Sequence, residues 1–147
     1  MRGRCIIILS LAINLFFCFV SFSATLPDEN AAKDLTNKIM TKIANGDIDN
    51  AFKLMKPYVP ISATEIDSAA IQTKAQLEQY GQRYGEPIGF EFIDSTKIGD
   101  SVFRFRYLAK MKNNALPWVF IFYKTTDGWT LNNFSWKDSV VNLFEKN

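Results

Sequence analysis

The segment from Trp118 to Trp136 constrains the fold of this chain most strongly, because it describes two strands joined by a tight turn. An apolar run, 118–123, is followed by Asp127-Gly128 and then by a second run rich in aromatic and β-branched residues. An Asp-Gly step between such runs is a strong hairpin signal, since glycine adopts a positive φ without steric cost. Both faces of the first run are apolar, so its strand is expected to lie centrally in a sheet or at a buried seam.

Residues 1–23 have the pattern of a secretory signal peptide. Arg2 and Arg4 precede an almost wholly apolar run, and Ser21 and Ser23 supply the small residues that a cleavage site after Ser23 needs. We therefore predict export to the periplasm or the extracellular medium, with a mature single domain covering residues 24–147. If the leader is not cleaved, it would anchor the protein in a membrane, and this is the one membrane contact we expect. A spanning helix needs about 20 apolar residues, and the apolar run of the leader is only slightly shorter.

The excess positive charge of the chain belongs to this leader. The full sequence has 17 basic and 15 acidic residues, and Arg2 and Arg4 account for the difference. A mature chain without net charge offers no basic field to nucleic acid, so we predict no nucleic-acid partner. Cys5 and Cys18 also lie in the leader, which leaves the mature domain without a thiol for a disulfide.

Histidine is absent from the whole sequence, which excludes Ser-His-Asp and Cys-His catalysis and imidazole metal sites. Asp47, Asp49 and Asn50 carry oxygen ligands of the kind that calcium prefers, but the rest of an EF-hand loop is missing. These residues are better explained as the start of a helix. We predict no metal site and no cofactor.

Capping and stop residues delimit three helices in the first half of the chain. The first begins at Asp28 and ends at Gly46, the second ends at Pro57, and the third begins with a Ser62/Glu65 capping box and ends at Gly85. Apolar residues recur at helical spacing in each of them, so each helix presents one apolar stripe to the core.

The apolar period then changes from that of a helix to that of a strand. We predict a strand over 88–94 with Phe90 and Phe92 inward, a second over 102–111, and then the hairpin with a bulge at Asn132-Asn133. Asp138 is predicted to cap a short terminal helix. Helices and strands in separate halves indicate an α+β fold: three N-terminal helices packed on a curved four-stranded antiparallel meander, with a short C-terminal helix.

This layout resembles the nuclear transport factor 2-like superfamily, also called the cystatin-like α+β roll. The local likeness lies in Ala44-Asn45-Gly46-Asp47-Ile48-Asp49-Asn50-Ala51-Phe52, a helix–Gly-Asp–helix entry, and in the closing strand Gly128-Trp129-Thr130-Leu131. The resemblance implies a sheet curled around a long helix with a conical pocket. It also implies either a ligand-binding or accessory domain, commonly a dimer through the sheet, or an isomerase or dehydratase that uses a buried Asp with Tyr or His.

A carboxylate with a phenol is the most enzyme-like combination that the chain offers. Asp94 is expected at the end of the first strand, and four tyrosines are placed to approach a pocket mouth: Tyr58, Tyr80, Tyr84 and Tyr107. A carboxyl group in an apolar cavity has a raised pKa and can move a proton. The alternative is that Asp94 starts a loop and that the tyrosines belong to the core.

Arg104 and Arg106 share one face of the second predicted strand. They can bind a carboxylate of a ligand or partner. The alternative is that they form a solvated face, which discourages pairing with the edge of another sheet. The aromatic residues, Trp118 among them, either line a ligand pocket or fill the core. Of these, we retain Arg104, Arg106, Tyr80, Tyr84, Tyr107 and Trp118 as candidate ligand or partner contacts.

One face of the sheet has no predicted helix to cover it. Val119, Ile121 and Tyr123 lie on that face, and a contiguous apolar patch usually marks an association surface. We predict a homodimer through this face. The predicted function is an exported binding or protein-interaction domain without catalytic activity, for an unknown protein or a small apolar ligand. The alternative is a small isomerase or dehydratase-like enzyme.

Overall fold

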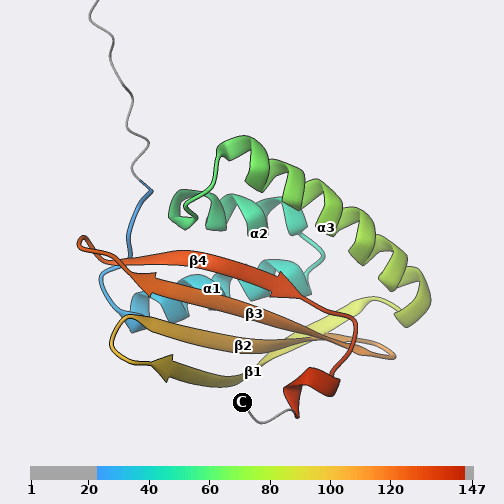
Figure 1. Ribbon diagram of the computed structural model, residues 1–147. Helices are drawn as coiled ribbons and strands as arrows, with labels where there is room; N and C mark the ends of the chain where they lie inside the picture. The colour runs from blue at the N-terminus through green and yellow to red at the C-terminus, as the bar shows by residue number, and fades with distance from the viewer. Residues whose placement is uncertain (1–22, 145–147) are drawn as a thin grey trace, which may run out of the picture.

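The computed structural model describes residues 23–144, so the predicted leader up to residue 22 lies outside the described residues. Helices and strands follow one another in separate halves of the chain, as predicted (Figure 1). The elements are α1 (Glu29–Ala44), α2 (Ile48–Met55), the 3₁₀ helix η1 (Lys56–Tyr58), α3 (Ala63–Tyr84), β1 (Pro87–Ile98), β2 (Val102–Met111), β3 (Ala115–Lys124), β4 (Trp129–Trp136) and the 3₁₀ helix η2 (Val141–Leu143).

The starts of α1 and α3 that were predicted from capping residues are observed. The Asp28 carboxylate accepts a hydrogen bond from the backbone N–H of Ala31 at 2.8 Å, which satisfies one of the free donors in the first turn of α1. At α3, the Ser62 side chain accepts from the Glu65 N–H while the Glu65 carboxylate accepts from the Ser62 N–H. Local sequence therefore sets where both helices begin.

The four strands form one antiparallel sheet in the order β1-β2-β3-β4. Burial alternates along the whole of β2, and Phe103, Phe105 and Tyr107 are among the residues on its buried face. The predicted bulge in β4 is confirmed: Ile121 pairs with Asn133 and Phe122 with Leu131, which leaves Asn132 without a cross-strand partner.

The helices cover one face of the sheet, which we call the inner face, and the other is the outer face (Figure 1). Helix α1 packs on β1 and β2, and α3 packs on α2. Phe52 of α2 reaches β4, where its ring meets that of Phe134 edge to face at 5.4 Å. The core between the two layers is built largely from aromatic side chains of the inner face together with the apolar stripes of α1 and α2.

The predicted hairpin turn forms, and a close backbone contact explains its glycine. Gly128 has φ 141°, and a Cβ atom there would lie 2.7 Å from the carbonyl oxygen of Leu26. Leu26 and Trp129 exchange two backbone hydrogen bonds of 2.8 Å, so the segment before α1 lies against the turn. Only glycine combines this φ with this approach.

The first strand is longer than the predicted 88–94. Residues 95–98 continue it because they pair with the start of β2, with Thr96 opposite Arg104 and Ile98 opposite Val102. Phe92 lies on the inner face, as predicted, where its ring meets those of Phe105 and Tyr107, but it is at the margin of the sheet and is 38% exposed. Its ring contacts the Lys33 ammonium, a cation–π arrangement at the outer edge of the core.

The predicted short C-terminal helix is not observed as an α-helix. Within residues 23–144 the chain forms only the three-residue 3₁₀ helix η2 after β4. Asp138, the predicted cap, instead accepts a hydrogen bond from the Tyr80 hydroxyl at 3.0 Å. The β-branched pair Val140-Val141 also disfavours an α-helix, because such side chains lose rotamer freedom in one.

Candidate functional site

A pocket of about 210 Å³ lies between α3 and the inner face of the sheet. Its wall comes from several elements that are far apart in the sequence: Ile43, Gly46 and Ile48 at the α1–α2 junction, Lys74, Leu77, Glu78 and Gly81 from α3, Pro87 from β1, Ala109 and Met111 from β2, and Leu116 from β3. We call this the α3 pocket.

Helical spacing and strand pairing explain why these residues meet. Positions 74, 77, 78 and 81 follow the three- and four-residue steps that place side chains on one face of a helix. Ala109 and Leu116 are direct cross-strand partners, and both are buried on the inner face. The pocket is thus closed on one side by α3 and on the other by the β2–β3 pair.

The interior of the α3 pocket is apolar, and its two charged residues are exposed. Lys74 Nζ lies 2.6 Å from Asp49 Oδ2, and this hydrogen bond raises the pKa of Lys74. Glu78 is exposed one turn farther along α3. A molecule inside the pocket would therefore meet hydrocarbon walls, with charged groups only at the rim.

Tyr80 and Tyr84, predicted ligand contacts, lie on α3 but do not line the pocket. Their rings stack at 5.7 Å, and Tyr80 meets Trp136 edge to face at 5.5 Å. Trp136 in turn stacks on Trp118 at 6.0 Å. These four rings therefore lie in a row from the surface of α3 into the core. The hydrogen bond that the Tyr80 hydroxyl donates to Asp138 raises the pKa of Tyr80.

Tyr107 and Trp118, also predicted contacts, are fully buried in the core. The Tyr107 hydroxyl lies 2.7 Å from Thr36 Oγ1 and donates to Asn37 Oδ1 at 2.9 Å, and burial raises the pKa of Tyr107 to about 12. The indole Nε1 of Trp118 has no hydrogen-bond partner among the described residues. Neither side chain lines the α3 pocket.

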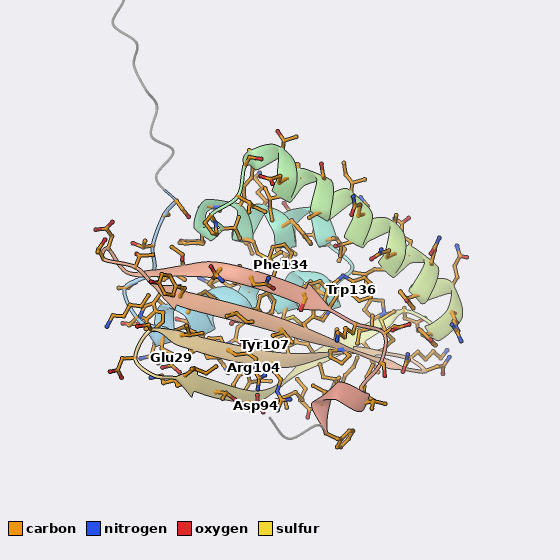
Figure 2. All side chains as sticks on the ribbon, in the orientation of Figure 1. Glu29, Asp94, Arg104, Tyr107, Phe134 and Trp136 are labelled. Atoms are coloured by element: carbon orange, nitrogen blue, oxygen red, sulfur yellow. The ribbon has the colours of Figure 1, made fainter. Side chains whose placement is uncertain are left out.

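Arg104 and Arg106 lie on the outer face, but they have different surroundings. Arg106 donates from Nε to Asp94 Oδ1 at 2.8 Å and also pairs through Nη2 with Oδ2, a bidentate arrangement. Arg104 donates from Nη2 to Thr96 Oγ1 at 3.3 Å, and its buried Nε has no partner among the described residues. Figure 2 shows Asp94 and Arg104 on the neighbouring strands β1 and β2.

A bulge in β1 separates Asp94 from the tyrosines. Phe92 pairs with Tyr107 on the inner face, but Asp94 pairs with Arg106 on the outer face, so Ile93 is an extra residue that reverses the alternation. The guanidinium of Arg106 lowers the pKa of Asp94. Asp94 is thus an ion-paired carboxylate on the face opposite Tyr107, and the structure does not assemble the carboxylate–phenol pair considered from the sequence.

The predicted interface residues lie beside the two arginines. Val119 is the cross-strand partner of Arg106, Ile121 that of Arg104, and Tyr123 that of Val102. Val119 and Ile121 are half-buried in the single chain, whereas Tyr123 is 47% exposed. The nearby Ile98 is 72% exposed, so apolar side chains are exposed at the Tyr123 end of the outer face.

The sequence interpretation missed the residues that line the α3 pocket. The one usable signal was the helical spacing of Lys74, Leu77, Glu78 and Gly81. Among residues 23–144, no group of acidic side chains is placed to hold a metal ion. In the same part of the chain, no helix is both long enough and apolar enough to cross a membrane.

Helices on one face of a four-stranded meander, with an apolar pocket beneath a long helix, define a nuclear transport factor 2-like α+β fold. Among solved structures, the chain is similar to a Campylobacter jejuni protein assigned as an NTF2-like transpeptidase. The TM-score is 0.50 at 16% sequence identity, over 69% of this chain and 97% of that one. The predicted α+β fold, with three helices followed by a four-stranded antiparallel sheet, is confirmed, but the predicted C-terminal α-helix is not. Models of known protein families give no match, and curated protein sequences give none either.

Proposed function

We propose that this protein is an exported binding domain that holds a small apolar molecule in the α3 pocket and does not catalyse a reaction. The observation that carries the proposal is the lining of the pocket, which is apolar except for the exposed Lys74 and Glu78. Sites of this kind hold a ligand mainly through burial of its apolar surface.

The position of the polar groups favours binding over an isomerase or dehydratase reaction. Proton transfer needs an acid or base within hydrogen-bond reach of the bound molecule. Asp94 is paired with Arg106 on the outer face, and Tyr107 is engaged by Thr36 and Asn37 in the core. Neither residue lines the α3 pocket, and the one carboxylate that does, Glu78, is exposed at its rim.

The transpeptidase assignment of the Campylobacter jejuni protein is not extended to this chain. Serine acyl transferases related to penicillin-binding proteins carry their nucleophile in a Ser-x-x-Lys motif. None of the serines in these 147 residues is followed by lysine at the third position, and histidine is absent. The shared feature is the fold, which hosts binding domains as well as enzymes.

Native mass spectrometry of the protein purified from its exported fraction tests the binding function. We expect a species heavier than the apoprotein by one small molecule, which organic extraction should release. Apoprotein alone, together with failure to take up any component of an apolar extract from the same cells, would contradict the proposal.

A second proposal, self-association through the outer face, is supported by exposed Tyr123 and Ile98 next to half-buried Val119 and Ile121. Burying this apolar surface against a second copy would remove it from water. Arg104 would lie beside the contact, because it is the cross-strand partner of Ile121.

A further inference from the structure

Gly81 is the one glycine in the described part of the chain whose presence neither the backbone nor packing explains. The other five, at 46, 85, 89, 99 and 128, all have φ between 57° and 141°. Gly81 lies inside α3 without a positive φ. Apart from its chain neighbours and the backbone of its own helix, a Cβ atom there would meet no atom within 4 Å. Alanine would fit this position and would favour the helix, because glycine loses more backbone freedom on folding.

The space above Gly81 belongs to the α3 pocket. Gly81 lies one helical turn after Leu77, on the same face of α3, and both residues line the pocket. The facing wall comes from the sheet, where Ala109 and Leu116 are buried partners. A side chain at position 81 would therefore extend into the pocket and reduce its volume.

The walls restrict the chemistry of a molecule that fills this space. The interior has no charged or hydroxyl side chain, and Lys74 at the rim is already paired with Asp49. A charged group inside would lose its hydration, and the exposed Lys74 and Glu78 at the rim would compensate that loss only in part. The volume, about 210 Å³, exceeds the roughly 150 Å³ of an engineered apolar cavity that holds one benzene ring.

We propose that Gly81 is a specificity-determining residue that keeps the α3 pocket open for a neutral, apolar group about the size of one substituted aromatic ring. The inference rests on the proposed binding function, since it names the class of ligand and the residue that admits it. Glycine is a poor helix former, and we infer that α3 keeps it at position 81 because a larger side chain would occupy the space of the ligand in the α3 pocket.

Fluorine NMR titration with 4-fluorotoluene tests this inference, with 4-fluorobenzoate and 4-fluorobenzylammonium as charged probes of similar shape. We expect the wild-type domain to bind 4-fluorotoluene and to bind both charged probes about tenfold more weakly or worse. Gly81→Leu should lose about tenfold or more in affinity for 4-fluorotoluene, and Gly81→Ala should show a smaller loss. Gln79→Leu is the matched control, because it adds the same side chain at an exposed position of α3, and it should bind like the wild type.

The outcomes separate the two levels of the proposal. If the wild type binds 4-fluorotoluene and both Gly81 variants bind it equally well, the role of Gly81 is overturned while the binding function stands. Equal or tighter binding of a charged probe overturns the assignment to neutral groups. No binding of any probe to the wild type contradicts the α3 pocket as a ligand site, and the role of Gly81 fails with it. If Gly81→Leu does not fold, judged by circular dichroism, Gly81→Ala carries the comparison.

Discussion

Asp94 and Arg106 face each other across β1 and β2 on the outer face of the sheet, with Nε of the arginine 2.8 Å from Oδ1 of the carboxylate. The pair is partly covered, since the arginine side chain is 16% exposed and the aspartate side chain 34%. Arg106 also donates from Nη1 to the carbonyl oxygen of Leu143 at 3.4 Å, so it connects η2 to the sheet. This arrangement gives a structural role to two residues that the sequence offered as functional candidates.

Asp94→Asn should destabilise the protein by about 1 kcal/mol at neutral pH, because it removes the charge from a partly exposed bidentate pair. The pKa of Asp94 is lower in the folded state than in the unfolded state. Its contribution is therefore present above the unfolded value of about 3.9 and is lost as pH falls through the lower folded value. Urea unfolding at a series of pH values should show the two proteins converging below about pH 4. The exposed Asp34→Asn is the control; a difference independent of pH would contradict the ion-pair role.

Tyr107→Phe should cost about 1 kcal/mol at neutral pH, because it removes the buried hydroxyl that contacts Thr36 and Asn37. Burial raises the pKa of Tyr107 to about 12 in the folded state, so the neutral phenol stabilises the fold below the unfolded value of about 10. That contribution is lost between about pH 10 and about 12. Alkaline unfolding, followed by ultraviolet absorbance, should show that the variant loses stability less steeply with rising pH than the wild type does. The exposed Tyr123→Phe should keep the wild-type profile.

Gly81→Ala should raise the free energy of unfolding by up to about 1 kcal/mol, the difference in helix propensity between the two residues. Apart from its chain neighbours and the backbone of α3, no atom lies within 4 Å of the added methyl group, so packing against other elements does not oppose the gain. Thermal unfolding of the ligand-free protein measures it. A lower melting temperature would show that α3 or the pocket wall cannot accept the methyl group.

Ile121→Lys should dissociate the proposed homodimer while leaving the fold intact, because Ile121 is half-buried on the outer face rather than in the core. Sedimentation velocity at tens of micromolar should give a dimer for the wild type and a monomer for the variant. Thr126→Lys, which adds the same charge in the exposed hairpin turn, should remain dimeric. A monomeric wild-type protein would refute the outer face as a homodimer interface.

The exported protein should lack the leader, with an intact mass that begins at Ala24 after cleavage behind Ser23, or at Thr25 after cleavage behind Ala24. Mass spectrometry of the periplasmic or secreted fraction measures this directly. Recovery of Met1 to Val20 in a membrane fraction would instead show that the leader remains as an anchor.

Local signals in the sequence determined most of the secondary structure. The capping box of Ser62 and Glu65, the alternation along β2, the Asp127-Gly128 turn and the irregularity at Asn132 are each encoded within a few residues. Their physical causes, which are free backbone donors, side-chain direction and permitted φ, act over the same short range. The order of these elements then sufficed to indicate the nuclear transport factor 2-like fold.

Tertiary structure alone decided the faces and the site. One extra residue, Ile93, turns Asp94 to the outer face and toward Arg106, and a one-residue change of register reverses every side chain beyond it. The α3 pocket combines residues as distant as Ile43 and Leu116, so no local pattern could locate it. The prediction of a terminal helix was wrong because of another long-range contact. Asp138 accepts a hydrogen bond from Tyr80, 58 positions away in the sequence, instead of capping its own segment.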